Sequence, residues 1–177
     1  MAADESNPTC TKRFDSIGVE SSEENRRDYR ELLFRSEGMK GNIGGVILFD
    51  ETIRQFAADG TSLVDLISSQ GALPGIKVDK GLQPIGDSKE SLTQGLEGLD
   101  ERLKEYFSLG AKFTKWRAVI NIDNLLPSSE AISANMQALA DYAKVVQDNN
   151  MVPMVEPEVL MDGVHSIDDC YDATSRC

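Results

Sequence analysis

Three segments of the sequence place two ionisable side chains two positions apart within otherwise apolar stretches. These pairs are Lys77 with Asp79, Lys115 with Arg117, and Glu156 with Glu158. Side chains two residues apart on a strand lie on the same face, so each segment would present both charges together. Any one pair could be a solvated strand edge. Three such pairs are harder to explain in that way, because a desolvated charge costs on the order of several kcal/mol unless it is paired.

A cluster of lysines, an arginine and carboxylates suits carbonyl chemistry on an anionic substrate. A lysine that is desolvated or crowded by other cations has a lowered pKa, which frees its amine to act as a nucleophile or base. A carboxylate beside it can exchange protons while a carbinolamine forms and breaks down, for a gain of about 100- to 10,000-fold. The residues alone therefore predict a metal-independent enzyme that acts on a phosphorylated carbonyl compound.

The sequence contains few residues that could form a metal site, a disulfide framework or a histidine-dependent catalytic site. His165 is the only histidine, and the three cysteines, Cys10, Cys170 and Cys177, have no CxxC spacing. This argues against a zinc site, a disulfide framework and a Ser/His/Asp triad, and we expect free thiols, no metal and no cofactor. The N-terminus is acidic where a signal peptide needs a basic region, and no apolar run reaches the roughly 18 residues of a membrane span, so we expect no export and no membrane partner.

The length and charge of the chain narrow the choice further. The 177 residues suffice for one domain with a hydrophobic core, and we expect residues 1–177 to form a single domain. Eighteen basic against 30 acidic residues give a net charge of −12. Such a surface repels phosphate backbones, so we expect no nucleic-acid partner, and an anionic ligand must be met by a local group of cations.

Short apolar runs alternate along the chain with segments of helical spacing. Strands are predicted over residues 44–50, 75–80, 113–120 and 151–158, each with the composition of a buried strand, and residues 1–4 look like the last residues of another. Helices are predicted from 21–24 with Tyr29, Leu32 and Leu33 on one face, over 61–70 with Leu63, Leu66 and Ile67 inward, from Leu99 to Gly110, over 127–146, and over 167–177.

This alternation predicts βαβ units on a parallel sheet. An open doubly wound sheet and a (β/α)8 barrel both fit the pattern, but no GxGxxG or Walker A sequence follows any strand, which favours the barrel. A barrel normally needs about 200 residues or more. We therefore predict an α/β fold, an incomplete (β/α)8 TIM barrel with about five βα units, in which the chain is cut at both ends.

A series of polar-rich sequence blocks runs in order from Ala2 to the end of the chain. The blocks are AADES, KRF, IGVE, ENRR, YRELLF, GGVILFDET, GIKVDKG, TQGLEGL, KWRAVI and NNMVPMVEPEVLMDGVH. They closely resemble the class I, Schiff-base type of fructose-bisphosphate aldolase. The resemblance implies a (β/α)8 barrel that reversibly cleaves fructose 1,6-bisphosphate into dihydroxyacetone phosphate and glyceraldehyde 3-phosphate, a lyase of glycolysis and gluconeogenesis. Transaldolase, another Schiff-base barrel, is disfavoured by the VEPE and GIKVDKG blocks.

The resemblance also implies roles for individual residues. Asp4 resembles the acid beside the Schiff-base nitrogen, Lys115 the lysine that stabilises charge during bond cleavage, and Glu156 the proton-shuttling glutamate, with Glu158 its neighbour. The implied substrate-binding residues are Ser6 and Thr9 at the phosphate, Lys12 and Arg13 in a loop lining the same mouth, Lys77, and the phosphate-binding Arg117.

The chain also departs from the family pattern. The family's Schiff-base lysine lies on the sixth strand, beyond Cys177, and Asn7-Pro8-Thr9-Cys10 replaces the commoner Thr-Gly stretch. The full-length protein is expected to be a cytoplasmic homotetramer, with a plastid location as the alternative. An alternative function is a catalytically inactive truncated aldolase that acts as a binding or scaffold protein.

Overall fold

The computed structural model describes residues 1–177, which divide into two compact units. The first unit contains residues 1–77 and 104–114, and the second contains residues 78–103 and 115–177. Helix α5 (Leu99–Ser108) and strand β6 (Phe113–Ile120) contribute residues to both. None of the helices combines the length and the apolar character that crossing a membrane requires.

The first unit is built on three parallel strands, β1 (Ala2–Ala3), β2 (Gly45–Leu48) and β3 (Leu73–Lys77). Their order in the sheet is β1-β2-β3. The predicted strands are confirmed, although β3 starts and ends earlier than predicted, at Leu73 and Lys77. Asp79 therefore lies beyond the strand, and the expectation that it shares a strand face with Lys77 is wrong.

Glycine is required where β2 and β3 meet the ring of Phe113. A Cβ atom at Gly75 would lie 2.3 Å from the ring, and one at Gly45 would lie 3.0 Å from it. The GGVILF and PGIK stretches therefore combine β-branched residues, which fill the sheet, with glycines that let an aromatic side chain lie on the backbone.

Four helices belong to the first unit: α1 (Asn7–Asp15), α2 (Glu23–Phe34), α3 (Asp50–Ile53) and α4 (Leu63–Ser69). Ser22 caps α2 by accepting a hydrogen bond from the Asn25 amide, so the predicted start is correct. The predicted apolar face is only partly covered, since Leu32 is 73% exposed whereas Tyr29 and Leu33 are half-buried. Helix α4 buries Leu63, Leu66 and Ile67 as predicted.

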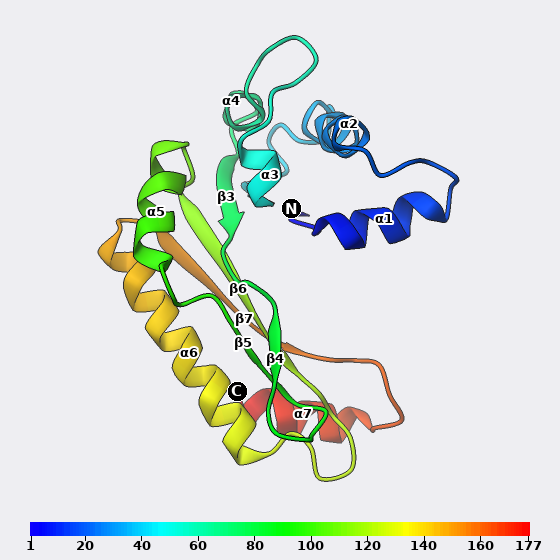
Figure 1. Ribbon diagram of the computed structural model, residues 1–177, viewed down its shortest axis with the longest axis vertical. Coiled ribbons are helices and arrows are strands. Elements are labelled where there is room, and N and C mark those ends of the chain that lie inside the picture. The colour runs from blue at the N-terminus through cyan, green and yellow to red at the C-terminus, as the bar shows by residue number, and fades with distance from the viewer. The chain divides into compact units, whose positions relative to one another are not determined.

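The second unit pairs β6 with β7 (Val152–Val159) and packs α6 (Ser129–Asp148) against them. Figure 1 shows α6 running alongside these strands, with α7 (Ile167–Arg176) following β7. A hairpin that the sequence analysis missed, β4 (Leu82–Pro84) with β5 (Ser91–Thr93), also packs on α6. Buried Asn135 of α6 holds the hairpin in this position, because its side-chain amide donates a hydrogen bond to the Ser91 carbonyl.

Strand β7 is less buried than predicted. All of its residues are exposed or half-buried, and Val152 is 66% exposed. The reason is topological, because β7 has β6 as its neighbour in the sheet and lies at the sheet's edge. The apolar, β-branched composition of this segment is typical of a buried strand, but burial also needs a second neighbour that composition cannot supply.

Each of the five parallel strands is followed by a helix of seven or more residues before the next one begins. The chain therefore contains five βα units, as predicted. Helix α5 buries Leu99, Leu103 and Tyr106 as its spacing predicts, whereas Phe107 is 43% exposed.

The glycine positions can be tested by adding one methyl group. We expect Gly75→Ala to lower the free energy of unfolding by about 1–3 kcal/mol, because the new Cβ overlaps Phe113. Gly44→Ala is the matched control, since a Cβ there meets no atom within 4 Å. Urea unfolding of both variants measures the difference, and equal stabilities would show that the Phe113 contact is not constraining.

Candidate active site

Two ion pairs cross from β6 to β7 on one face of the second unit. The Lys115 Nζ atom lies 3.2 Å from the Glu156 carboxylate, and the Arg117 guanidinium lies 3.3 Å from the Glu158 carboxylate. The spacing of two on each strand thus places cations on β6 opposite carboxylates on β7. This confirms for both strands that the members of each pair share a face.

The opposite face of β6 packs against α6. Trp116, between the two cations, is fully buried and lies against Tyr142 of α6, with ring centroids 5.2 Å apart. Because successive side chains on a strand alternate between faces, the Trp116 contact directs Lys115 and Arg117 away from the helix. The aromatic pair therefore sets the direction in which the two cations point.

Lys115 and Glu156 differ in their access to water. The Lys115 side chain is 9% exposed, whereas that of Glu156 is 35% exposed. A nearly desolvated ammonium can stabilise a negative charge that develops beside it, since it is weakly screened. A partly exposed carboxylate next to it can exchange protons with both substrate and solvent. The pair is thus equipped for charge stabilisation and proton transfer.

In the first unit, Asp4 follows β1 directly and is 8% exposed. It therefore lies at the carboxyl end of a parallel strand, the end at which barrel enzymes carry their catalytic groups. Lys77 is the last residue of β3 and is half-buried, so it also lies at the carboxyl end of its strand. Both positions agree with the predicted placement.

The segment after Asp4 is a helix rather than the expected loop. Lys12 and Arg13 lie in the last turn of α1, which starts after Ser6 and has a proline in its first turn. The Ser6-Asn7-Pro8 sequence is a signal for such a start, because serine favours the N-cap and proline the first turn. Both cations are exposed, and Arg13 pairs with Glu5, which raises the pKa of the guanidinium.

Ser6 and Thr9, the two predicted phosphate contacts, lie next to each other at the start of α1. Their hydroxyl oxygens are 3.1 Å apart. Ser6 is half-buried and Thr9 is exposed, so both hydroxyls reach the surface. The structure thus brings Ser6 and Thr9 together at the N-terminus of a nine-residue helix, where backbone amides favour anions.

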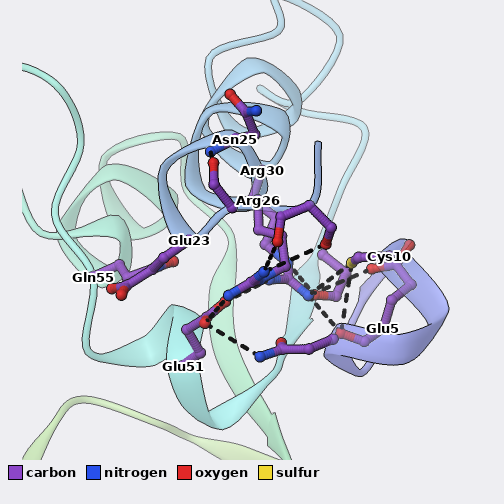
Figure 2. Close-up of polar contacts among 12 residues, drawn as sticks. Glu5, Cys10, Glu23, Asn25, Arg26, Arg30, Glu51 and Gln55 are labelled. Carbon is purple, nitrogen blue, oxygen red and sulfur yellow. Dashed lines mark hydrogen bonds and ion pairs between the residues drawn. The ribbon is translucent and has the colours of Figure 1, made fainter. Parts of the chain in front are cut away.

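A second group of charged residues, buried under α2, was missed from the sequence. Arg26 binds Glu51 through two hydrogen bonds of 2.8 and 2.6 Å. Arg30 is fully buried and donates to the carbonyl oxygens of Ala3 and Glu5 (Figure 2). The sequence spacing could have predicted this group, because residues 26, 30 and 34 are four positions apart and form the inward face of α2.

The charges in this group alter the pKa values of their neighbours. The hydrogen bond from Arg26 holds the pKa of the Glu51 carboxyl below its usual range, although burial acts in the opposite direction. Burial raises the pKa of the Cys10 thiol, and Arg30 offsets this only in part. Cys10 is fully buried and mainly in the thiol form at neutral pH, which does not favour a reactive cysteine.

Comparison of the whole chain with known proteins shows which family it belongs to. The family model "Glycolytic: Fructose-bisphosphate aldolase class-I" matches residues 1–177. The chain belongs to the class-I fructose-bisphosphate aldolase family. It is 54% identical over 175 residues to a probable class 1 aldolase of Xanthomonas axonopodis, a match that covers 98% of this chain and 52% of the relative.

Other aldolases show the same relation. A cytosolic aldolase of Arabidopsis thaliana is 51% identical over 177 residues, covering 99% of this chain and 49% of its own length. A chloroplastic aldolase of Chlamydomonas reinhardtii is also 51% identical, over 97% of this chain and 46% of its own length. The chain therefore spans about half the length of the curated relatives it matches, and these relatives include both cytosolic and chloroplastic forms.

A solved aldolase structure extends the match to the fold. The aldolase of Plasmodium falciparum, solved in complex with TRAP and a small-molecule inhibitor, matches 99% of this chain with a TM-score of 0.96 and 47% identity. The match covers 52% of that aldolase chain. Together with the five βα units, this confirms the predicted incomplete (β/α)8 barrel.

The Arg26–Glu51 pair predicts an acid-sensitive part of the stability. Because the folded state depresses the pKa of Glu51 from its usual 4.5, the pair stabilises the fold above that pH and loses its effect as the pH falls through the folded value. We expect Glu51→Gln to be less stable than wild type by about 2 kcal/mol at pH 7. The difference should shrink below about pH 4.

Urea unfolding between pH 3 and pH 7 measures this difference, with Glu24→Gln as the control. Glu24 is on the same helix as Arg26, but its side chain is 77% exposed and its only ion pair, to Arg27, is 3.7 Å long. We expect the control to follow wild type within about 0.5 kcal/mol. A Glu51→Gln penalty that is independent of pH would contradict the account.

Proposed function

We propose that this chain supplies the acid, the cations and the proton shuttle of a class I fructose-bisphosphate aldolase, which reversibly cleaves fructose 1,6-bisphosphate into dihydroxyacetone phosphate and glyceraldehyde 3-phosphate. The observation that carries the proposal is the buried Lys115 paired with Glu156 across β6 and β7, in a member of this family. The Schiff-base lysine would come from a segment beyond residue 177, as the resemblance implies.

The catalytic roles follow from environment as well as from resemblance. Nearly desolvated Lys115 stabilises the charge that develops when the carbon–carbon bond breaks, and partly exposed Glu156 transfers protons. Glu158, paired with Arg117, is its neighbour on the same face of β7. Asp4, at the end of β1, acts beside the Schiff-base nitrogen.

The substrate carries two phosphates, which a chain of net charge −12 must meet with local cations. We assign substrate binding to hydroxyl and cationic residues that lie on or next to α1 and within β3 and β6: Ser6, Thr9, Lys12, Arg13, Lys77 and Arg117. Exposed Lys12 and Arg13 are accessible to an anion from solvent. The net charge supports the absence of a nucleic-acid partner.

The remaining proposals concern the whole protein. Residues 1–177 would form part of a single barrel domain, and the complete protein would assemble as a homotetramer. We place it in the cytoplasm, with a plastid as the alternative, because the relatives include proteins named cytosolic and chloroplastic.

A second candidate function is a binding or scaffold protein without catalysis. The exposed apolar residues of β7 favour it, since Val152 is 66% exposed and Val155 49% exposed on an edge strand. An open edge of this kind promotes association with other chains. A 177-residue chain that acts in this way would be oligomeric in solution, whereas a monodisperse monomer would count against it.

Covalent trapping tests the proposed reaction. Borohydride reduces an imine between a lysine and a ketose phosphate to a stable secondary amine. The full-length protein should therefore lose activity irreversibly when treated with borohydride and dihydroxyacetone phosphate together. It should keep its activity when either reagent is omitted, and mass spectrometry should find the adduct only with both present. Inactivation that does not depend on the ketose phosphate would overturn the proposal.

The role of Lys115 has its own test. We expect Lys115→Met in the full-length protein to lower the turnover number by about 100-fold or more, because it removes the charge that meets the transition state. Lys144→Met is the matched control, since Lys144 is exposed on α6 and pairs with Asp148 of the same helix. Both variants should unfold at similar denaturant concentrations. Near-normal turnover of Lys115→Met would show that the ion pair between Lys115 and Glu156 has no catalytic role.

A further inference from the structure

Arg30 forms an unusual set of contacts for a buried arginine. Its side chain has no exposed surface, and its Nε atom donates to the Ala3 carbonyl at 3.2 Å. Its Nη2 atom donates to the Glu5 carbonyl at 2.6 Å. Figure 2 shows this side chain reaching from α2 towards the segment that contains Glu5 and Cys10.

The two carbonyls that Arg30 binds lie on either side of Asp4. Strand β1 pairs with β2 only through Ala2 and Ala3, which face Ile47 and Leu48. Asp4 therefore lies just beyond the last paired residue of a two-residue strand. The guanidinium of Arg30 spans this part of the backbone, from the Ala3 carbonyl to the Glu5 carbonyl.

The charge of Arg30 is incompletely compensated. Its contacts with the carboxylates of Glu5 and Glu51 are 3.9 and 3.8 Å long, beyond hydrogen-bond distance, and Glu51 is already bound by Arg26. Its Nη1 atom and the Glu5 Oε2 atom are buried without hydrogen-bond partners. An arginine placed here only to fill space would be a poor choice, because an apolar side chain fills space without this desolvation.

We propose that Arg30 is a positioning residue, which acts through Asp4 by clamping the backbone carbonyls on both sides of it. The inference rests on the proposed function, in which Asp4 acts beside the Schiff-base nitrogen. The guanidinium is the side chain suited to this task, because its rigid fork presents several donors in one plane. A lysine ammonium keeps the charge but lacks the planar fork that spans both carbonyls.

The experiment compares Arg30→Lys with wild type in the full-length protein, by steady-state cleavage of fructose 1,6-bisphosphate. We expect the turnover number to fall by about 100-fold, since a catalytic group displaced by about 1 Å loses that much. The Michaelis constant should change by less than about twofold, because Arg30 does not contact the substrate. Arg26→Lys is the matched control, as Arg26 lies one turn away and binds Glu51 rather than the backbone around Asp4.

A double-mutant cycle separates positioning from general stability. If Arg30 acts through Asp4, Arg30→Lys should lower turnover by less than about twofold in an Asp4→Asn background, because coupled residues are not additive. Phe34→Leu disturbs the same buried face of α2 without touching the clamp, and it should leave turnover near wild type while lowering stability. Equal losses in both backgrounds would overturn the proposal.

The outcomes distinguish the two proposals. A wild-type protein that neither cleaves the substrate nor forms the borohydride adduct overturns the proposed function and this inference with it. An active wild type whose Arg30→Lys variant keeps its turnover overturns the inference alone. If Arg30→Lys does not fold, Arg30→Gln takes its place in the cycle.

Discussion

A charged side chain that is removed from water needs a partner of opposite charge or a hydrogen-bond acceptor within a few ångströms. This constraint governs the packing within each of the two units. Lys115 has 9% of its side chain exposed and meets Glu156 at 3.2 Å. Arg26 and Glu51 form a bidentate pair, and Arg30 donates to two backbone carbonyls through its Nε and Nη2 atoms. Because breaking the buried Arg26–Glu51 pair costs about 2 kcal/mol, the helices α2 and α3 that carry its two side chains are held in a fixed relation.

The same pairing also prepares the chemistry. On β6, Trp116 directs its two neighbours away from α6, so the cations that the fold requires to be paired are also the cations that can face a substrate. In the first unit, the arginine that fills the space under α2 also fixes the backbone on both sides of Asp4. Under the proposed function, structural and catalytic roles are therefore combined in a few residues. A single substitution such as one at Arg30 can affect both, which is why separating them needs coupled variants.

Periodicity and residue type predicted the strands β2, β6 and β7 and the helices α2, α4, α5, α6 and α7. They also predicted that the two charged side chains on β6, and the two on β7, share a face of their strand. The same reasoning failed where burial depends on distant neighbours. Leu32 is exposed while Arg26 and Arg30 are buried on α2, because Glu51 and the carbonyls around Asp4 come from other parts of the chain. Strand β7 looked buried from its composition, but its place at the sheet edge is a property of topology. The β4–β5 hairpin has strands of three residues, too short for a periodic signal.

The central claim is that Lys115 and Glu156, which pair across β6 and β7, serve the substrate. A crystal structure of the full-length protein with fructose 1,6-bisphosphate bound tests it most directly. We predict that Lys115 and Glu156 both lie within hydrogen-bond distance of the bound sugar, with a phosphate oxygen near Arg117. A sugar phosphate that contacts neither Lys115 nor Glu156 would contradict the account.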